Sequence, residues 1–175
     1  GRLVAPDQRA DVRDEAFYAL ATGRWSRRDP GAVVVGSLTK LFACPGLRAG
    51  YVVAPGPELA TRFRARQPAW SVNALAVALV PDLLAIADLG AWAGRIAGLR
   101  RELVGVLSSH HLAPLASEAN WVLVPGATGL RHALALHGIV VRDCSSFGLP
   151  DHVRVAVPGP AGLERLDQAL TALGR

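Results

Sequence analysis

The sequence has 175 residues, and 51% of them are hydrophobic, which is enough for a domain with a sizeable core. Nineteen basic and fourteen acidic residues give a net charge of +5, but the basic residues are scattered, and no zinc-finger spacing, RNA-recognition signature or obvious helix-turn-helix accompanies them. We therefore expect no nucleic-acid partner, because a solvated face or an anionic small-molecule substrate explains the charge more simply.

Further features narrow the class of protein. No apolar run reaches the roughly 18 residues that a membrane-spanning helix needs, and no signal-peptide pattern is visible, so we expect a cytoplasmic protein without a membrane partner. Cys44 and Cys144 are too few for a disulfide framework and suit no metal site, so we expect two free thiols. The sequence starts with glycine and has no methionine, which leads us to expect a fragment or a processed piece.

The first half of the chain predicts alternating strands and helices. Residues 1–12 are poorly patterned, and Pro6 breaks any regular element there. Residues 32–35 form a short β-branched run that is typical of a buried parallel strand, and residues 51–54 predict a second strand. Helices are predicted over residues 58–66, over 72–79 with Ser71 as the cap and Pro81 as a break or kink, and over 82–109, where two helices could meet near Gly90.

The second half predicts a smaller unit. The patterns indicate a strand over residues 119–124, a helix over 130–137 ending at Gly138, strands over 139–141 and 152–157, and an amphipathic helix over 161–173. The order resembles a βαββα unit. The whole chain is therefore predicted to be α/β, with a boundary somewhere within residues 90–112.

Lys40 is the only lysine among the nineteen basic residues. A lysine amine can lose its proton and attack a carbonyl, whereas a guanidinium stays protonated, so Lys40 is a candidate for covalent chemistry. The hydroxyls of Ser37 and Thr39 and the guanidinium of Arg48 would suit a phosphate dianion beside it. An ordinary loop with a stray lysine is the alternative.

Residues 37–51, SLTKLFACPGLRAGY, resemble the cofactor-lysine segment of fold-type I enzymes that depend on pyridoxal phosphate, in the class I/II aminotransferase superfamily. The resemblance implies pyridoxal 5'-phosphate as the cofactor and Lys40 as the catalytic lysine that binds it as a Schiff base. It also implies that Ser37, Thr39 and Arg48 hold the cofactor phosphate.

The segment Asp14-Glu15-Ala16-Phe17 resembles a second motif of that family, upstream of the lysine. The resemblance implies that the Asp14 carboxylate pairs with the pyridinium nitrogen and so keeps the ring an electron sink. Many relatives have tyrosine where Phe17 stands. Without the resemblance, the Asp-Glu pair would be a solvated helix start.

Two arginines stand out near the end of the chain. Arg154 lies in an otherwise apolar strand, where a guanidinium needs an anion. Arg142 could be an ordinary salt-bridge partner of Asp143 or Asp151. The resemblance implies that Arg154 binds the substrate α-carboxylate and that Arg142 lies near the distal phosphate of a phosphorylated substrate.

The resemblance implies the aminotransferase fold, with residues 1–100 as the remainder of the large cofactor-binding domain and residues 101–175 as a small C-terminal α+β domain. The loop around Pro45 and residues 67–76 and 142–147 are more similar to threonine-phosphate decarboxylases of cobalamin biosynthesis than to the related histidinol-phosphate aminotransferases. This implies decarboxylation of L-threonine O-3-phosphate to aminopropanol phosphate. Transamination of a phosphorylated amino acid is the alternative, and a non-catalytic remnant or binding module is another.

The resemblance covers only about the second half of a family member. It implies a homodimer for the full-length enzyme and a small phosphorylated amino acid as its substrate. Because the first half of the family's fold supplies much of the cofactor site, we expect the isolated chain to bind the cofactor weakly and to be inactive alone.

Overall fold

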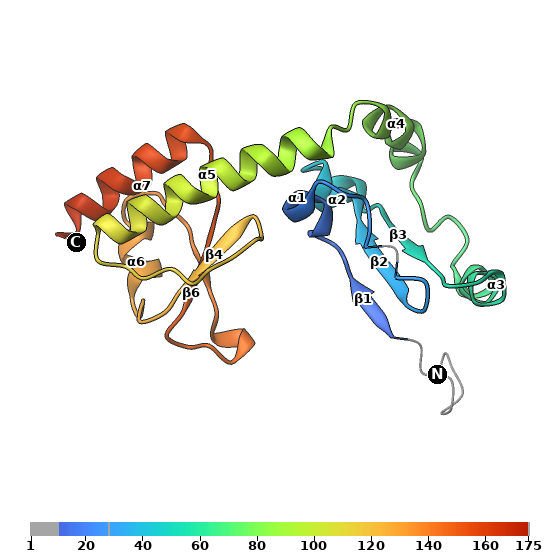
Figure 1. Cartoon of the computed structure of the whole chain (residues 1–175), viewed down its shortest axis with the longest axis horizontal. Helices are drawn as coiled ribbons and strands as arrows, with labels where there is room; N and C mark the ends of the chain where they lie inside the picture. Colours follow the sequence, from blue (N-terminus) through green and yellow to red (C-terminus); the bar gives the residue numbers. More distant parts are fainter. Residues whose placement is uncertain (1–10, 28, 175) are drawn as a thin grey trace. The chain divides into compact units, whose positions relative to one another are not determined.

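The computed structural model describes residues 11–27 and 29–174, and the break expected at Pro6 lies outside them. The chain divides into two compact units, the first ending at Gly90 and the second beginning at Ala91 (Figure 1). The domain boundary expected after residue 100 would fall inside helix α5 (Leu89–Ser109), and that boundary stays a prediction.

The first unit is built on a sheet of three strands in the order β1-β2-β3. Strand β1 (Val12–Asp14) runs parallel to β2 (Val33–Ser37), and β3 (Gly50–Val53) is antiparallel to β2. Val33 and Val34 are buried, which confirms the prediction of a buried parallel strand from the β-branched run. The residues of β1 are exposed, in keeping with the polar sequence that leads to Asp14.

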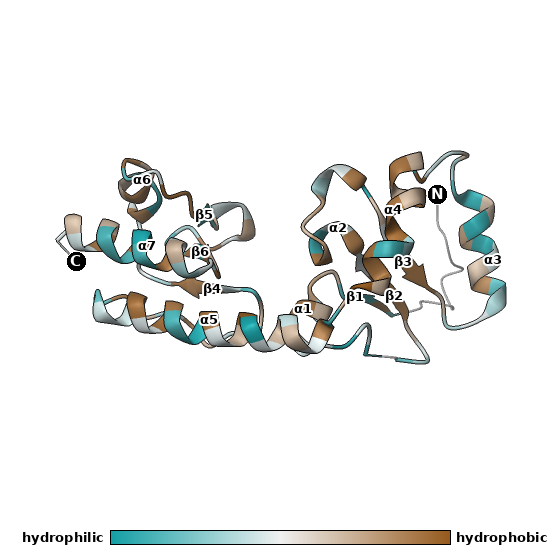
Figure 2. Cartoon of the chain, turned by 90° about the horizontal axis from the view of Figure 1, so that it is seen from above, coloured by the Kyte–Doolittle hydropathy of each residue, from teal (hydrophilic) through white to brown (hydrophobic). Residues whose placement is uncertain are grey.

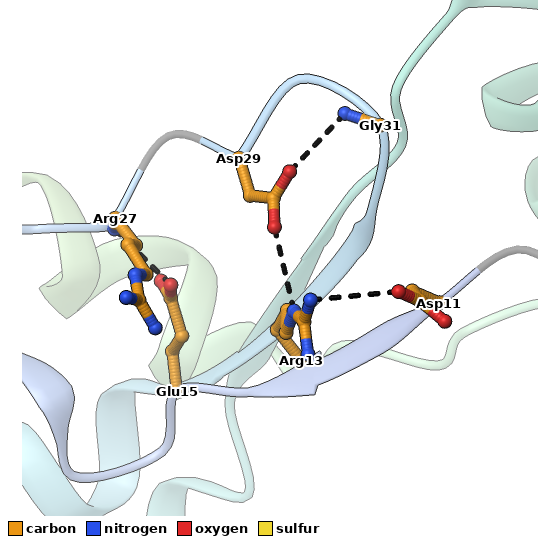
Figure 3. Close-up of polar contacts among 6 residues, drawn as sticks. All are labelled: Asp11, Arg13, Glu15, Arg27, Asp29 and Gly31. Carbon is orange, nitrogen blue, oxygen red and sulfur yellow. Dashed lines mark hydrogen bonds and ion pairs between the residues drawn. The ribbon is translucent and has the colours of Figure 1, made fainter.

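Short helices connect these strands. Helix α1 (Tyr18–Thr22) lies between β1 and β2, and α2 (Leu38–Leu41) with a 3-10 turn (Pro45–Leu47) lies between β2 and β3. Arg13 forms ion pairs with Asp11 and Asp29, both at 3.4 Å, and thereby ties the turn before β2 to β1 (Figure 3).

Two helices follow β3. Helix α3 (Pro57–Arg66) was predicted closely, but α4 (Ala74–Ala85) corrects the sequence-based expectation. Its cap is Asn73 rather than Ser71, because the Asn73 side chain accepts a hydrogen bond from the Ala76 N–H at 2.9 Å. Pro81 lies inside the helix and does not end it, since a proline removes only one backbone donor. Helix α4 is apolar over most of its length (Figure 2), and several of its apolar side chains are exposed, among them Leu75, Val77 and Leu84.

The second unit has the predicted βαββα order. After α5 come β4 (Trp121–Val124), α6 (Leu130–Ala135), β5 (Arg142–Asp143), β6 (Val153–Ala156) and α7 (Pro160–Ala172), and the sheet order is β4-β6-β5 with antiparallel neighbours. Its core is made of leucines from the helices and valines from the strands, such as Leu103, Leu107, Val122, Val155 and Leu170.

One expectation for the second unit was wrong. The strand predicted over residues 139–141 is not formed; the Ile139 N–H donates to the Leu134 carbonyl, so these residues complete the turn after α6, and pairing with β6 starts at Arg142. The long helical pattern over residues 82–109 is divided between two helices, as expected, because α4 ends at Ala85 and α5 begins at Leu89, just before Gly90. No single helix among the described residues is long and apolar enough to cross a membrane; α4 and α5 meet that test only when counted together.

Candidate functional site

The carboxyl ends of β1 and β2 meet at one edge of the first sheet. Asp14 is the last residue of β1 and pairs in register with Val35, and Ser37 is the last residue of β2. Because the two strands are parallel neighbours, Asp14 and Ser37 open onto the same edge, where open α/β sheets place their ligands. The sequence motifs around Asp14 and Lys40 are thus brought together by strand pairing.

Two hydroxyls are adjacent at this edge. The Ser37 and Thr39 hydroxyls lie 2.9 Å apart and share a hydrogen bond, and both residues are half-buried. The Thr39 N–H donates to the Ala49 carbonyl at 3.2 Å, and the Cys44 N–H donates to the Thr39 carbonyl at 3.0 Å. These backbone bonds hold the loop closed on itself, so the hydroxyl pair is fixed before any ligand binds.

Lys40 is the next residue, in α2, and its side chain is exposed. Its amine lies 5.3 Å from the centre of the Phe17 ring, within the range of a cation–π contact. Asp14 precedes this ring by three residues, and its Oδ1 accepts a hydrogen bond from the Ala16 N–H at 2.9 Å. The amine and the Asp14–Phe17 turn therefore lie side by side.

Arg48 does not join the hydroxyl pair. It has a left-handed backbone conformation, with φ of 48°, and its Nη1 donates to the Pro45 carbonyl at 3.3 Å. Among the described residues, its guanidinium makes no hydrogen bond to Ser37 or Thr39. Its assignment to the cofactor phosphate stays a prediction.

Asn73, whose role was not predicted from the sequence, supports the loop that carries Arg48. Its Nδ2 donates to the Leu47 carbonyl at 2.7 Å while its Oδ1 caps α4. One side chain thus fixes both the helix start and the residue before Arg48. An asparagine directly before an apolar helical run could have been predicted as the helix cap, but Ser71 is also a residue type that caps helices.

The role of Glu15 was also not predicted, because only Asp14 of the Asp-Glu pair was assigned to the site and Glu15 was expected to be exposed to solvent. Glu15 is only 7% exposed, and its Oε1 accepts a hydrogen bond from the Arg27 N–H at 3.1 Å (Figure 3). Its Oε2 is buried and has no hydrogen-bond partner among the described residues. The buried carboxylate therefore ties the segment after α1 to the base of the Asp14 turn.

Tyr51 lies close to this carboxylate. Its hydroxyl donates to the Trp25 carbonyl at 3.2 Å, and its ring covers Gly36, where a Cβ would overlap the ring carbons. Burial, and secondarily the charge of Glu15, raises the pKa of the Tyr51 phenol. Gly36 and Tyr51 are cross-strand partners in β2 and β3, so this packing fixes the sheet immediately before Ser37.

The second unit holds the two predicted substrate arginines. Arg142 on β5 and Arg154 on β6 are direct cross-strand partners, and with Arg131 of α6 they line a cavity of about 530 Å³. Among the described residues, none of these three arginines forms an ion pair with a carboxylate. Asp143 also lines the cavity, so three arginines and one carboxylate leave its lining with an excess of positive charge.

The ordinary salt-bridge alternative for Arg142 is not observed. Asp143 Oδ1 instead accepts a hydrogen bond from the Ser145 N–H at 2.9 Å, and Asp151 lies 2.6 Å from Nδ1 of His152. The hydrogen bonds from Ser145 lower the pKa of the Asp143 carboxyl, and the charges of nearby arginines lower it further.

Comparison with known proteins defines the class. Residues 12–173 match the family model described as aminotransferase class I and II, and the chain belongs to this family. Its α/β fold is the fold type I of pyridoxal-phosphate-dependent aminotransferases, as the sequence predicted. Pyridoxal phosphate is the cofactor of the family, and the similar histidinol-phosphate aminotransferase of Sinorhizobium meliloti was solved in complex with it.

Individual relatives are similar over much of this chain. The histidinol-phosphate aminotransferase of Symbiobacterium thermophilum is 38% identical over 150 residues, which are 82% of this chain and 40% of the relative. The structure of the histidinol-phosphate aminotransferase from Clostridium acetobutylicum has a TM-score of 0.82 at 24% identity, covering 95% of this chain and 55% of the other. The L-threonine-O-3-phosphate decarboxylase from Porphyromonas gingivalis has a TM-score of 0.76 at 25% identity, covering 94% and 55%. The chain spans about half or less of the length of the curated relatives it matches.

Proposed function

We propose that this chain is part of an enzyme that uses pyridoxal phosphate to transfer the amino group of a small phosphorylated substrate, as a histidinol-phosphate aminotransferase does. The observation that carries the proposal is the meeting of Asp14, the Ser37–Thr39 hydroxyl pair and Lys40 at one sheet edge. Several curated relatives bear the name histidinol-phosphate aminotransferase, which favours transamination over decarboxylation.

The residues at this edge fit the cofactor. Two adjacent hydroxyls can donate to a phosphate, an exposed amine can bond an aldehyde, and a carboxylate at a strand end can accept from a protonated ring nitrogen. When bound, pyridoxal phosphate supplies the aldehyde and an electron-withdrawing ring. Ser37, Thr39, Lys40 and Asp14 would hold it, with Arg48 as a further phosphate ligand.

Each residue then has a distinct task. Lys40 would hold the cofactor through its aldehyde, and its Nζ would move a proton to and from the substrate Cα. Asp14 would hold a proton on the ring nitrogen. Ser37 and Thr39 would bind the phosphate and so limit the movement of the ring.

The arginines of the second unit support an anionic substrate. Arg142 and Arg154 are cross-strand neighbours without a carboxylate partner among the described residues, and guanidinium groups bind carboxylate and phosphate through two parallel hydrogen bonds. We assign both to the anionic groups of the substrate.

Decarboxylation of threonine phosphate is the second candidate. It is supported by the sequence segments that resemble threonine-phosphate decarboxylases and by the fold similarity to the Porphyromonas gingivalis decarboxylase at 25% identity. The two reactions share Lys40 and Asp14 and differ in which bond at the substrate Cα is broken.

A homodimer is the further expectation for the full-length protein. The exposed apolar side chains of α4, such as Leu75 at 68% and Val77 at 63%, offer a surface that another polypeptide could cover. Sedimentation of the full-length protein checks this state.

Product analysis tests the function. The full-length protein, loaded with pyridoxal phosphate, is given L-histidinol phosphate with 2-oxoglutarate, or O-phospho-L-threonine alone. We expect glutamate from the first mixture, no carbon dioxide from the second, and neither product from the Lys40→Ala variant. Carbon dioxide release without glutamate formation would establish the decarboxylase instead.

A further inference from the structure

Arg142 and Arg154 are like charges at directly opposed positions of β5 and β6. Like charges placed opposite each other on one sheet face are destabilising. On β6, Val153 and Val155 are buried in the core, so Arg154 and Ala156 belong to the other face of the sheet, at the cavity. Asp143 also lines this cavity, but within the described residues neither guanidinium forms an ion pair with it, so other contacts orient the two side chains.

Each guanidinium lies over an aromatic ring. The Arg154 guanidinium carbon is 5.0 Å from the centre of the Trp121 ring, and that of Arg142 is 5.4 Å from the Phe147 ring. Both distances fall within the roughly 6 Å range of cation–π attraction, for which tryptophan is the best partner. Trp121 is half-buried whereas Phe147 is 59% exposed, so the contact with Trp121 is the less screened of the two.

The backbone that carries Trp121 is firmly held. The Ser117 hydroxyl donates to the Trp121 carbonyl at 2.7 Å, and Trp121 pairs with Ala156 of β6. Arg100 Nη1 donates to the carbonyls of Glu118 and Ala119 at 3.0 and 2.9 Å, which fixes the approach to β4. The backbone from which the indole projects is therefore fixed.

We propose that Trp121 is a positioning residue whose indole face holds the Arg154 guanidinium ready for an oxyanion of the substrate. A free arginine side chain loses rotamer freedom when it binds an anion, and a guanidinium already held on a ring loses less. The inference rests on the proposed function only where it assigns Arg154 to substrate binding. The group that Arg154 would bind is a carboxylate or a phosphate.

Anion affinity tests this role without catalysis. The full-length protein, loaded with cofactor so that the cofactor site is filled, is titrated calorimetrically with inorganic phosphate and with succinate. We expect the Trp121→Leu variant to bind the preferred anion about fivefold more weakly, and the Trp121→Phe variant, which keeps a ring, to lose less than about twofold. Trp70→Leu, which removes an indole that is 96% exposed, should bind as the unchanged protein does. The anion that responds shows which oxyanion Arg154 takes.

Substrate kinetics should show the same pattern. The Trp121→Leu variant should raise KM about fivefold and leave kcat within about twofold, because the loss lies in binding. Unchanged affinity in Trp121→Leu, equal losses in Trp121→Leu and Trp121→Phe, or no binding of either anion would overturn the proposal.

A second measurement avoids the Trp121 variants, in case they fail to fold. Anion binding should change tryptophan fluorescence in the unchanged protein and in Trp70→Leu, but not in Arg154→Gln; a response that persists in Arg154→Gln overturns the proposal. Failure of the proposed function is distinguishable, because it would appear as absent glutamate formation while anion binding still depends on Trp121.

Discussion

The amine of Lys40 lies 5.3 Å from the centre of the Phe17 ring, so the residue that follows β2 meets the turn that follows β1. The contact places a ring face, rather than a hydroxyl, beside the amine that would bind the cofactor. Phe17 therefore restrains Lys40 through its π-face.

Removing this ring should loosen the lysine. We expect Phe17→Leu to weaken pyridoxal phosphate binding by about two- to fivefold, the equivalent of a partly exposed cation–π contact, in the full-length protein. Phe17→Tyr keeps the ring and should bind as the unchanged protein does or better. Titration with the cofactor, followed by its absorbance, measures the affinity. Equal affinities for Phe17→Leu and the unchanged protein would show that the contact does not matter.

Gly36 should not tolerate a side chain. Its Cβ would overlap the Tyr51 ring, so we expect Gly36→Ala to lower the free energy of unfolding by about 1–3 kcal/mol, as overpacking does. Gly31→Ala is the matched control, because no atom lies within 4 Å of a Cβ there, and it should change stability by less than about 0.5 kcal/mol. Chemical denaturation measures both. In a Tyr51→Ala background the cost of Gly36→Ala should fall sharply, and an undiminished cost would refute the assigned clash.

Tyr51 should titrate above the usual range of a tyrosine. Burial raises its pKa first and the charge of Glu15 adds to this, so Glu15→Gln should lower the pKa of Tyr51 without returning it to the ordinary value. Because the folded state binds this proton more tightly than the unfolded chain, its contribution to stability is present below the ordinary pKa and is lost as pH rises through the folded-state value. Phenolate absorbance during alkaline titration measures the shift, with Tyr51→Phe to identify the signal. A Tyr51 pKa that is the same in Glu15→Gln and in the unchanged protein would exclude the electrostatic contribution.

Asn73 should stabilise the chain in two separable ways. Asn73→Ala loses both the α4 cap and the bond to the Leu47 carbonyl, and should cost about 1–2 kcal/mol of unfolding free energy. Asn73→Asp keeps an acceptor for the Ala76 N–H but loses the donor to Leu47, so it should cost about half as much. Thermal or chemical unfolding compares the variants; if Asn73→Asp is as destabilised as Asn73→Ala, the cap contributes little.

Much of the fold could be predicted because apolar patterns mark it. The β-branched run at residues 33–35 and the βαββα order of the second unit depend on local periodicity, and both are observed. The boundaries depended on contacts distant in sequence: Asn73 prevails over Ser71 as the cap of α4, where it also bonds Leu47, and the strand expected before Arg142 starts only where β6 supplies a partner.

In the candidate site, too, some residues could be predicted from local sequence motifs and others depend on contacts distant in sequence. Lys40, Ser37, Thr39 and Asp14 could be proposed from motifs, and strand pairing brings their segments together. Glu15 could not, because its burial depends on residues that follow α1 and on the neighbourhood of Tyr51 in β3. Likewise, no local pattern predicts that Trp121 and Phe147 lie under Arg154 and Arg142, since both rings reach the arginines only after the chain has folded.

Covalent capture of the cofactor tests the central claim most directly. The full-length protein is incubated with pyridoxal phosphate, reduced with borohydride, digested and mapped by mass spectrometry. The proposal predicts one pyridoxyl adduct, on Lys40, and none in the Lys40→Arg variant, because a guanidinium does not form the reducible bond. An adduct on another residue, or no adduct under conditions in which the protein is folded, would contradict the assignment of Lys40 as the cofactor lysine.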